Sequence, residues 1–182
     1  KPVISVKKID RGTAARQNVT DAADAIDTIL ASEWSAADIT RSEALTDEQF
    51  VRRVYLELGG RIPRLDEAKT FLASSSKQKR IELIDDLLTS PDYVSHSYNF
   101  WADILRLKER PDQQRLIFEP YMDWVKQSIA DNTPYDEWVF AMLTADGKIW
   151  DNPAVGYQLR DRGMALPYVD NTVRVFLGTQ IG

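Results

Sequence analysis

The residues with the clearest chemical potential lie on one predicted helix. His96 is the only histidine of the chain, and Asn99 and Asp103 follow it at positions that share its face of a helix. The three side chains could form a proton relay in which Asp103 orients the imidazole. A solvent-facing polar stripe explains the same pattern more simply, and we favour that interpretation.

Two arginines complete the set of candidate catalytic residues. Arg53 is expected at the edge of an apolar helix face, where a carboxylate could pair with it and lock two helices together. We favour this structural role over anion binding. Arg106 stands three residues after Asp103, a spacing that suits an ion pair on one helix face. The candidate site therefore consists of Asp103, His96, Arg53 and Arg106.

The composition excludes several kinds of chemistry within these residues. There is no cysteine, so disulfides, thiolate catalysis, Cys-ligated zinc and thioether haem attachment have no ligand here. No phosphate-binding glycine loop, Gly-x-Ser-x-Gly elbow, His-Glu-x-x-His or calcium loop occurs, so we predict no metal-binding or cofactor-binding residue. A net charge of −5 and a pI near 5.0 argue against a nucleic-acid partner. No apolar run reaches the ~20 residues of a membrane span.

The fold class follows from the spacing of the apolar residues. They recur at helical intervals along most of the chain, and no stretch alternates convincingly with a period of two. We predict an all-α fold, an irregular bundle of about seven to nine helices without a significant sheet. Residues 1–18 are expected to form a flexible or extended arm, and residues 19–182 a single helical domain.

Capping residues predict where several helices begin and end. Thr46 and Gln49 form a capping-box pair, and Gly59-Gly60 should end the helix that they open. Thr20 is predicted to cap the first helix, and the polar stretch 35–45 to act as a linker. Three junctions place a capping side chain before a proline: Ser90-Pro91, Thr133-Pro134 and Asn152-Pro153. Gly178 is expected to end the last helix.

The five tryptophans offer a possible binding surface. Trp101, Trp124 and Trp138 fall on the apolar stripes of predicted helices, so core packing explains them. Trp34 and Trp150 are expected in breaks between helices, where an exposed ring could bind a glycan or a protein.

Four blocks of sequence carry a resemblance to a known family. In chain order they are DEQFVRRVYLELGGRIPRLDEAKTFL, KRIELIDDLLTSPDYVSHSYNFWADILR, TPYDEWVFAMLTADG and NTVRVFLGTQIG. Together they resemble, from about Thr46 to Gly182, the domain of unknown function that accompanies planctomycete-type cytochrome c modules in large exported bacterial proteins. Family members more often carry Thr at position 59 and a Thr-like cap at position 64, which affects only turn and cap details.

The resemblance implies a redox context outside this chain. In family members a block similar to the last one leads into Cys-x-x-Cys-His, the pattern of covalent c-type haem attachment. We therefore expect the chain to be part of a larger protein in which c-type haem is possible after Gly182. Its expected partners are adjacent domains of the same polypeptide, possibly a cytochrome c module. Export to the periplasm or cell surface is expected because c-type haem is attached outside the cytoplasm.

Three functions are compatible with these observations. The first is a non-catalytic helical module that supports or docks a redox centre outside the chain. The second is a hydrolytic enzyme domain linked to extracellular polymer breakdown, using Asp103, Arg53, Arg106 and His96. The third is a scaffold that binds a glycan or a protein through Trp34 or Trp150.

Overall fold

The computed structural model describes residues 13–107, 117–161 and 163–180, and within these ranges all of its regular secondary structure is helical. This confirms the predicted all-α class. The α-helices are α1 (Thr13–Ala36), α2 (Asp47–Gly59), α3 (Leu65–Ala73), α4 (Lys79–Leu88), α5 (Pro91–Ile104), α6 (Glu119–Ala130), α7 (Tyr135–Thr144), α8 (Gly156–Leu159) and α9 (Ala165–Leu177), with one 3-10 helix, η1 (Pro153–Val155). None of the described helices combines the length and apolar character needed to cross a bilayer.

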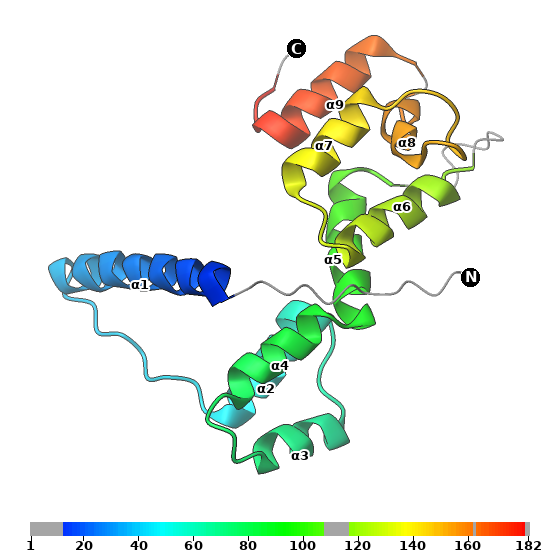
Figure 1. Ribbon diagram of the computed structural model, residues 1–182. Helices are drawn as coiled ribbons and strands as arrows, with labels where there is room; N and C mark the ends of the chain where they lie inside the picture. The colour runs from blue at the N-terminus through cyan, green and yellow to red at the C-terminus, as the bar shows by residue number, and fades with distance from the viewer. Residues whose placement is uncertain (1–12, 108–116, 162, 181–182) are drawn as a thin grey trace.

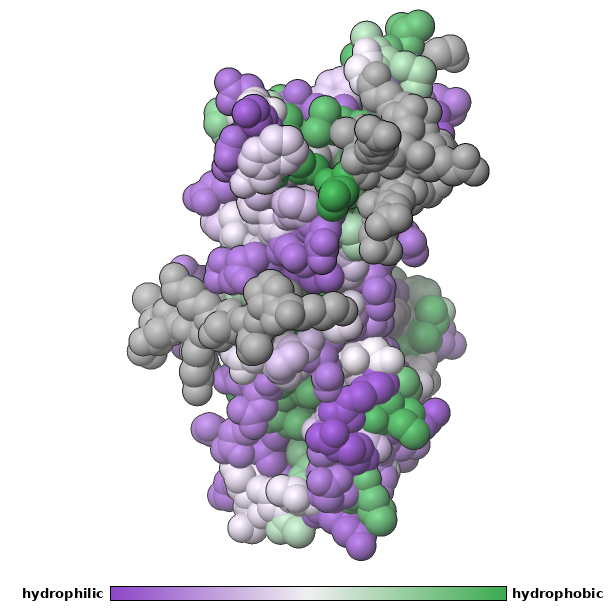
Figure 2. All heavy atoms as spheres, turned by 90° about the vertical axis from the view of Figure 1, so that its right-hand side faces the viewer, coloured by the Kyte–Doolittle hydropathy of each residue, from purple (hydrophilic) through white to green (hydrophobic). Residues whose placement is uncertain are grey.

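The buried side chains form two separate cores. The smaller core lies among α2, α3 and α4 and consists of Val51, Val54, Tyr55, Phe71 and Leu87. The larger core lies between the end of α5 and the α6–α8 region, and its largest fully buried side chains are Tyr121, Tyr157, Leu105, Met142 and Val125. On the face drawn in Figure 2, hydrophilic side chains form a band between the two halves of the molecule, and hydrophobic side chains reach the surface in separate patches.

Helix α5 connects the two cores. It packs against α2 and α4 on one side and against α6 on the other. Figure 1 shows it standing between the α2–α4 group and the α6–α9 group. Its later residues Tyr98 and Trp101 pack against the larger core. Trp138 is buried there, and its ring centroid lies 4.7 Å from that of Trp101. Trp124 packs on the same core, so the core interpretation of these three tryptophans is confirmed.

Several local signals act as predicted. The backbone N–H of Gln49 donates to Thr46 Oγ1 at 3.3 Å, and Gln49 Oε1 accepts from the Thr46 N–H at 3.1 Å, which completes the capping box. Gly60 ends α2 in the left-handed region at φ 66°. Ser90 Oγ accepts the N–H three residues further on at 3.2 Å. Gly178 caps α9 at φ 64°.

The first helix differs from the prediction. It begins at Thr13, so Thr20 lies inside it and does not cap it, and residues 13–18 are helical although an arm was expected. Residues 1–12 lie outside the described part. Large apolar side chains of α1 are exposed to solvent: Val19, Ile26, Ile29 and Leu30. Residues 39–46, which separate α1 from α2, have no regular structure, in line with the predicted linker.

At two of the three cap-proline junctions the side-chain cap is absent. Helix α7 starts directly after Pro134, so that Pro134 and not Thr133 stands at its cap position. At the third junction Pro153 opens η1 as predicted, but Asn152 makes no side-chain cap, and its amide donates to the Asp146 carbonyl at 3.2 Å. Helices therefore start at or next to both prolines, while the two predicted caps are wrong.

Gly156 permits the close approach of α8 to α6. A Cβ at this position would overlap Cβ and Cγ of the buried Tyr121, although the backbone is helical at φ −54°. We expect Gly156→Ala to lower the free energy of unfolding by about 1–3 kcal/mol, as overpacking does in other cores.

Gly59→Ala is the matched control for this prediction. Gly59 is also helical, but a Cβ there would meet its nearest neighbour at 3.7 Å. Alanine should then be neutral or stabilising by about 0.5–1 kcal/mol. Urea unfolding followed by circular dichroism measures both variants, and equal effects would contradict the proposed overlap at Gly156.

Candidate functional site

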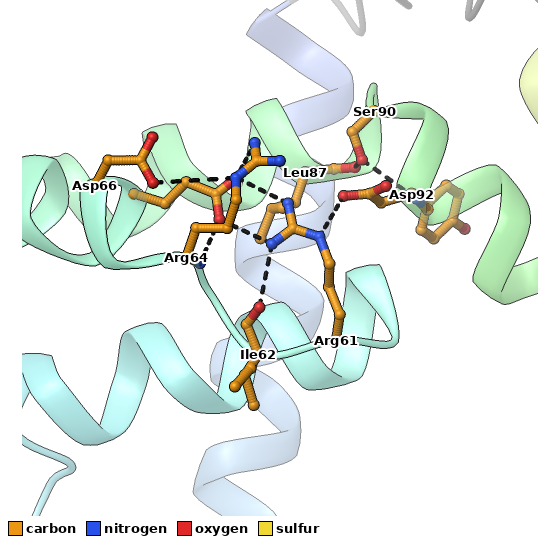
Figure 3. Close-up of polar contacts among 9 residues, drawn as sticks. Arg61, Ile62, Arg64, Asp66, Leu87, Ser90 and Asp92 are labelled. Atoms are coloured by element: carbon orange, nitrogen blue, oxygen red, sulfur yellow. Dashed lines mark hydrogen bonds and ion pairs between the residues drawn. The ribbon is translucent and has the colours of Figure 1, made fainter.

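Arg61 is the centre of an ionic cluster that joins three helices. Because Gly60 ends α2 in the left-handed region, the chain turns and Arg61 faces α3 and α5. Its two terminal nitrogens donate to the two Glu67 oxygens at 2.8 Å each, and its Nε donates to Asp92 Oδ2 at 2.7 Å (Figure 3). The fork of the guanidinium fits a carboxylate in two parallel bonds. The cluster therefore fixes the end of α2 to the starts of α3 and α5.

The charges in this cluster shift the acidity of its members. The hydrogen bonds from Arg61 are the main reason that the pKa of Glu67 falls to about 2, with partial burial opposing the shift. The same bonds raise the pKa of Arg61. Arg64 adds a second cation, with its Nη2 at 2.9 Å from Glu67 Oε1. Glu67 is thus held ionised well below its ordinary range.

A second ionic link joins α2 to α4. Asp47, in the first turn of α2, accepts from Lys79 Nζ at 2.7 Å and from Arg80 Nε at 2.9 Å. The hydrogen bonds from Lys79 and Arg80 lower the pKa of Asp47. This link joins the start of α2 to the start of α4.

The most deeply buried charges surround Asp161, directly after α8. Asp161 is 4% exposed and accepts from Arg160 Nε and Nη2 at 3.2 and 2.9 Å. Arg106 and Asn171 donate to its other oxygen at 3.4 and 3.3 Å. Arg160 also donates to the Leu105 carbonyl at 3.2 Å. The cluster therefore connects the end of α5, the end of α8 and the middle of α9.

The four candidate catalytic residues do not come together. His96 is exposed and lies over Gly60, and Asp103 is exposed further along α5. Arg53 pairs with Glu57 of its own helix at 3.1 Å, with both side chains mostly in solvent. Only Arg106 belongs to a partly buried centre, the Asp161 cluster.

Two predicted ion pairs are therefore wrong. Arg53 does not lock two helices, because it points away from the α2 core towards Glu57; Arg61, at the helix exit, has that role. Arg106 does not pair with Asp103, since it lies beyond the end of α5 with φ 55° and its side chain turns to Asp161.

The two tryptophans predicted in breaks lie in different settings. Trp34 is in the last turn of α1, is half-buried, and has the Arg41 guanidinium 5.8 Å from its ring centroid. Trp150 is 69% exposed in a turn after α7, with Lys148 Nζ 5.9 Å from its ring. The exposure predicted for Trp150 is confirmed, and the break predicted at Trp34 is wrong.

The described residues offer no ligand set for a metal ion or for an attached haem. Within the described ranges, no three His, Asp or Glu side chains are grouped so that they could hold a metal ion. The chain has no cysteine and so does not fit the covalent attachment of a c-type haem. We assign no residue of this chain to either group.

The chain belongs to the PSCyt2 family, described as a protein of unknown function (DUF1549), whose sequence model matches residues 25–182. This confirms the family predicted from the four sequence blocks. No curated protein and no solved structure matches the chain.

The sequence indicated Arg106 as a candidate, but not the other residues that form the two arginine clusters. Arg61 had a local signal, because it follows a double glycine and precedes Glu67 in the first turn of the next helix. Asp161 had none, because Arg106 stands 55 residues before it along the chain. Only the packing of α5 against the α8–α9 region brings these two residues together.

Because of the Arg61 cluster, we expect the free energy of unfolding to decrease as the pH falls through the acid range. We expect Glu67→Gln to lower the free energy of unfolding at neutral pH by about 2 kcal/mol, because a charge-assisted bidentate bond is lost. The pKa of Glu67 is depressed in the folded state, from 4.5 to about 2. Its contribution is therefore complete above pH 4.5 and disappears as the pH falls towards about 2.

Urea unfolding at several pH values measures this effect. The difference between Glu67→Gln and the unsubstituted chain should shrink as the pH falls through that window. Glu57→Gln is the control, because the exposed Arg53–Glu57 pair should contribute only about 0.3–0.5 kcal/mol. A Glu67→Gln effect that is equally small, or independent of pH, would contradict the account.

The Asp161 cluster gives a second prediction. Asp161→Asn should lower the free energy of unfolding by about 3 kcal/mol, because the guanidinium of Arg160, 7% exposed, loses its counter-charge. Asp170→Asn removes the half-buried partner of the exposed Arg174 and should cost less than about 0.5 kcal/mol. Thermal unfolding measures the stability of both variants. Similar losses of stability for Asp161→Asn and Asp170→Asn would contradict the expected effect of burial.

Proposed function

We propose that this chain is a non-catalytic helical module of an exported, cytochrome c-associated bacterial protein, and that it supports a redox centre in neighbouring sequence. Membership of the PSCyt2 family supports this context. The structural observation that carries the proposal is the last helix, α9, which has apolar side chains on two opposite faces.

The inner face of α9 is fixed to the larger core. Tyr168, Val175 and Phe176 pack on that core. The Thr172 hydroxyl lies 3.1 Å from that of the buried Tyr157, and Asn171 donates to Asp161. These contacts hold the orientation of α9 and leave its other face free to act as a surface.

The outer face of α9 is apolar and exposed. Leu166, Val169 and Leu177 are 84%, 43% and 71% exposed, and the half-buried Val173 lies in line with them. Their spacing places them on one stripe along the helix. A helix that is apolar on both sides is typical of an element covered on both sides. We therefore propose that an adjacent domain of the same polypeptide packs on this outer stripe.

The family resemblance indicates which kind of domain this neighbour would be. Since the last sequence block of family members leads into Cys-x-x-Cys-His, the neighbouring module would carry a c-type haem, which needs an apolar surrounding to limit its contact with water. The outer stripe of α9 offers such a cover. Export follows within the proposal, because c-type haem is attached outside the cytoplasm.

A longer version of the chain that continues past Gly182 tests this function. After production with the haem-attachment machinery, it should stain for covalent haem and show the visible spectrum of a c-type cytochrome. A colourless product without haem would contradict the redox proposal.

Variants of the longer chain test the surface itself. Leu166→Asp combined with Leu177→Asp should leave the haem attached but shift its midpoint potential, because water reaches the haem more easily. Leu65→Asp is the control, since Leu65 is 72% exposed but lies on α3. Equal potentials for all three proteins would contradict docking on α9.

A further inference from the structure

Three aromatic side chains lie together at the surface between α5 and α7. Phe100 is 62% exposed and Tyr135 is 54% exposed, while Trp101 between them is half-buried. The Trp101 ring centroid lies 5.6 Å from that of Phe100, at 80°, and 6.0 Å from that of Tyr135, at 32°. Trp138 supports them from the core. We call Phe100, Trp101 and Tyr135 the aromatic surface.

Core packing does not account for this exposure. Most of the Phe100 and Tyr135 surface faces solvent, although both residues adjoin a well-buried core. Exposed aromatic side chains that cluster in this way are typical of the central residues of protein interfaces. The aromatic surface is therefore a candidate binding site, distinct from the outer stripe of α9.

Exposed carboxylates stand close in sequence to the aromatic surface on both helices. Asp103 stands one turn after Phe100 on α5, and Asp136 and Glu137 follow Tyr135 in the first turn of α7. All three are exposed. Within the ranges that the structure describes, none of them pairs with a lysine or an arginine. The site thus combines the negative faces of aromatic rings with uncompensated negative charge.

The chain itself shows what such a combination binds. Among the described residues, five cations lie over an aromatic ring, with 4.5–5.1 Å to its centroid, and also pair with a carboxylate; they are Arg61, Lys79, Arg80, Lys126 and Arg160. Two further cations, Arg41 and Lys148, lie over a ring without such a pair. In the aromatic surface the ring and the carboxylate are present, and among the described residues no cation accompanies them.

We propose that the aromatic surface binds a cationic side chain, arginine above all, from a basic segment of a partner protein. The guanidinium stacks on an aromatic ring while Asp103 pairs with its charge. The net charge of −5 favours the approach of such a segment. This proposal is independent of the redox function, because it concerns only residues of α5 and α7.

A nuclear magnetic resonance titration of the chain tests the proposal. The probe is an acetylated tetra-arginine peptide, and the indole N–H signal of Trp101 reports on binding. A tetra-citrulline peptide has the same shape without charge, and a cello-oligosaccharide tests sugar stacking. We expect a saturable shift of the Trp101 signal with the arginine peptide alone, and weaker binding as salt is added.

Variants show whether the aromatic surface is responsible. Phe100→Ala and Asp103→Asn should each weaken binding of the arginine peptide about five- to tenfold. Both residues are exposed, so the variants should fold, and their circular dichroism spectra check this. Phe140→Ala is the matched control, because Phe140 is 68% exposed on α7 and has no described ring partner; it should bind as the unsubstituted chain does.

Four results would overturn the proposal. The Trp101 signal could respond equally to the citrulline peptide, which would indicate an apolar site. It could respond to the oligosaccharide alone, which would indicate a glycan site. Phe100→Ala could bind the arginine peptide as strongly as the unsubstituted chain does. Phe140→Ala could weaken binding as much as Phe100→Ala does. Either of these last two results would indicate diffuse attraction of the peptide to an acidic protein.

Discussion

The rest of the structure depends on the continuity of α5 through two cores. Each core is formed by helices that follow one another in the chain, α2–α4 in the smaller one and the end of α5 with α6–α9 in the larger one. A helix keeps its direction because each of its turns is tied to the next by backbone hydrogen bonds. The α2–α4 group and the α6–α9 group are therefore oriented relative to each other mainly by this one helix. A module built in this way can act as a rigid support without enclosing a ligand.

The arginine clusters act at the points where helices end. Arg61 ties the exit of α2 to α3 and α5, and Arg160 with Asp161 ties α8 to the end of α5 and to α9. A buried ion pair contributes little in comparison with apolar packing, but the loss of one partner is costly. These clusters therefore determine which helix ends meet, and the apolar side chains supply most of the stability. The combination of an arginine with both a ring and a carboxylate gives each contact a defined geometry.

The features that the sequence predicted correctly are those that depend on residues close together in the chain. The capping box at Thr46, the helix exit at Gly60 and the core position of Trp138 follow from side chains within a few residues. The cap predicted at Thr133 is wrong because α7 starts after Pro134, one residue later than the Thr-Pro pair predicts. Apolar residues recur along α1 at helical spacing, but spacing does not indicate whether another element covers them.

The candidate site was less predictable, for a physical reason. The carboxylate that pairs with an arginine can stand one turn away on the same helix, as for Arg53, or on another helix, as for Arg61. The choice depends on how helices pack. Likewise, the spacing of Trp101 indicates a core residue, but only the arrangement of α5 beside α7 leaves its ring half-buried and the neighbouring Phe100 exposed.

Native-state hydrogen exchange along α5 tests the central claim most directly, namely that this helix unites the two cores into one support. If it does, the slowest amides in both halves of α5 should exchange only by global unfolding, with the same free energy and the same dependence on denaturant. Two halves that exchange with clearly different free energies would mean that the cores open independently, and the account of a rigid support would then be wrong.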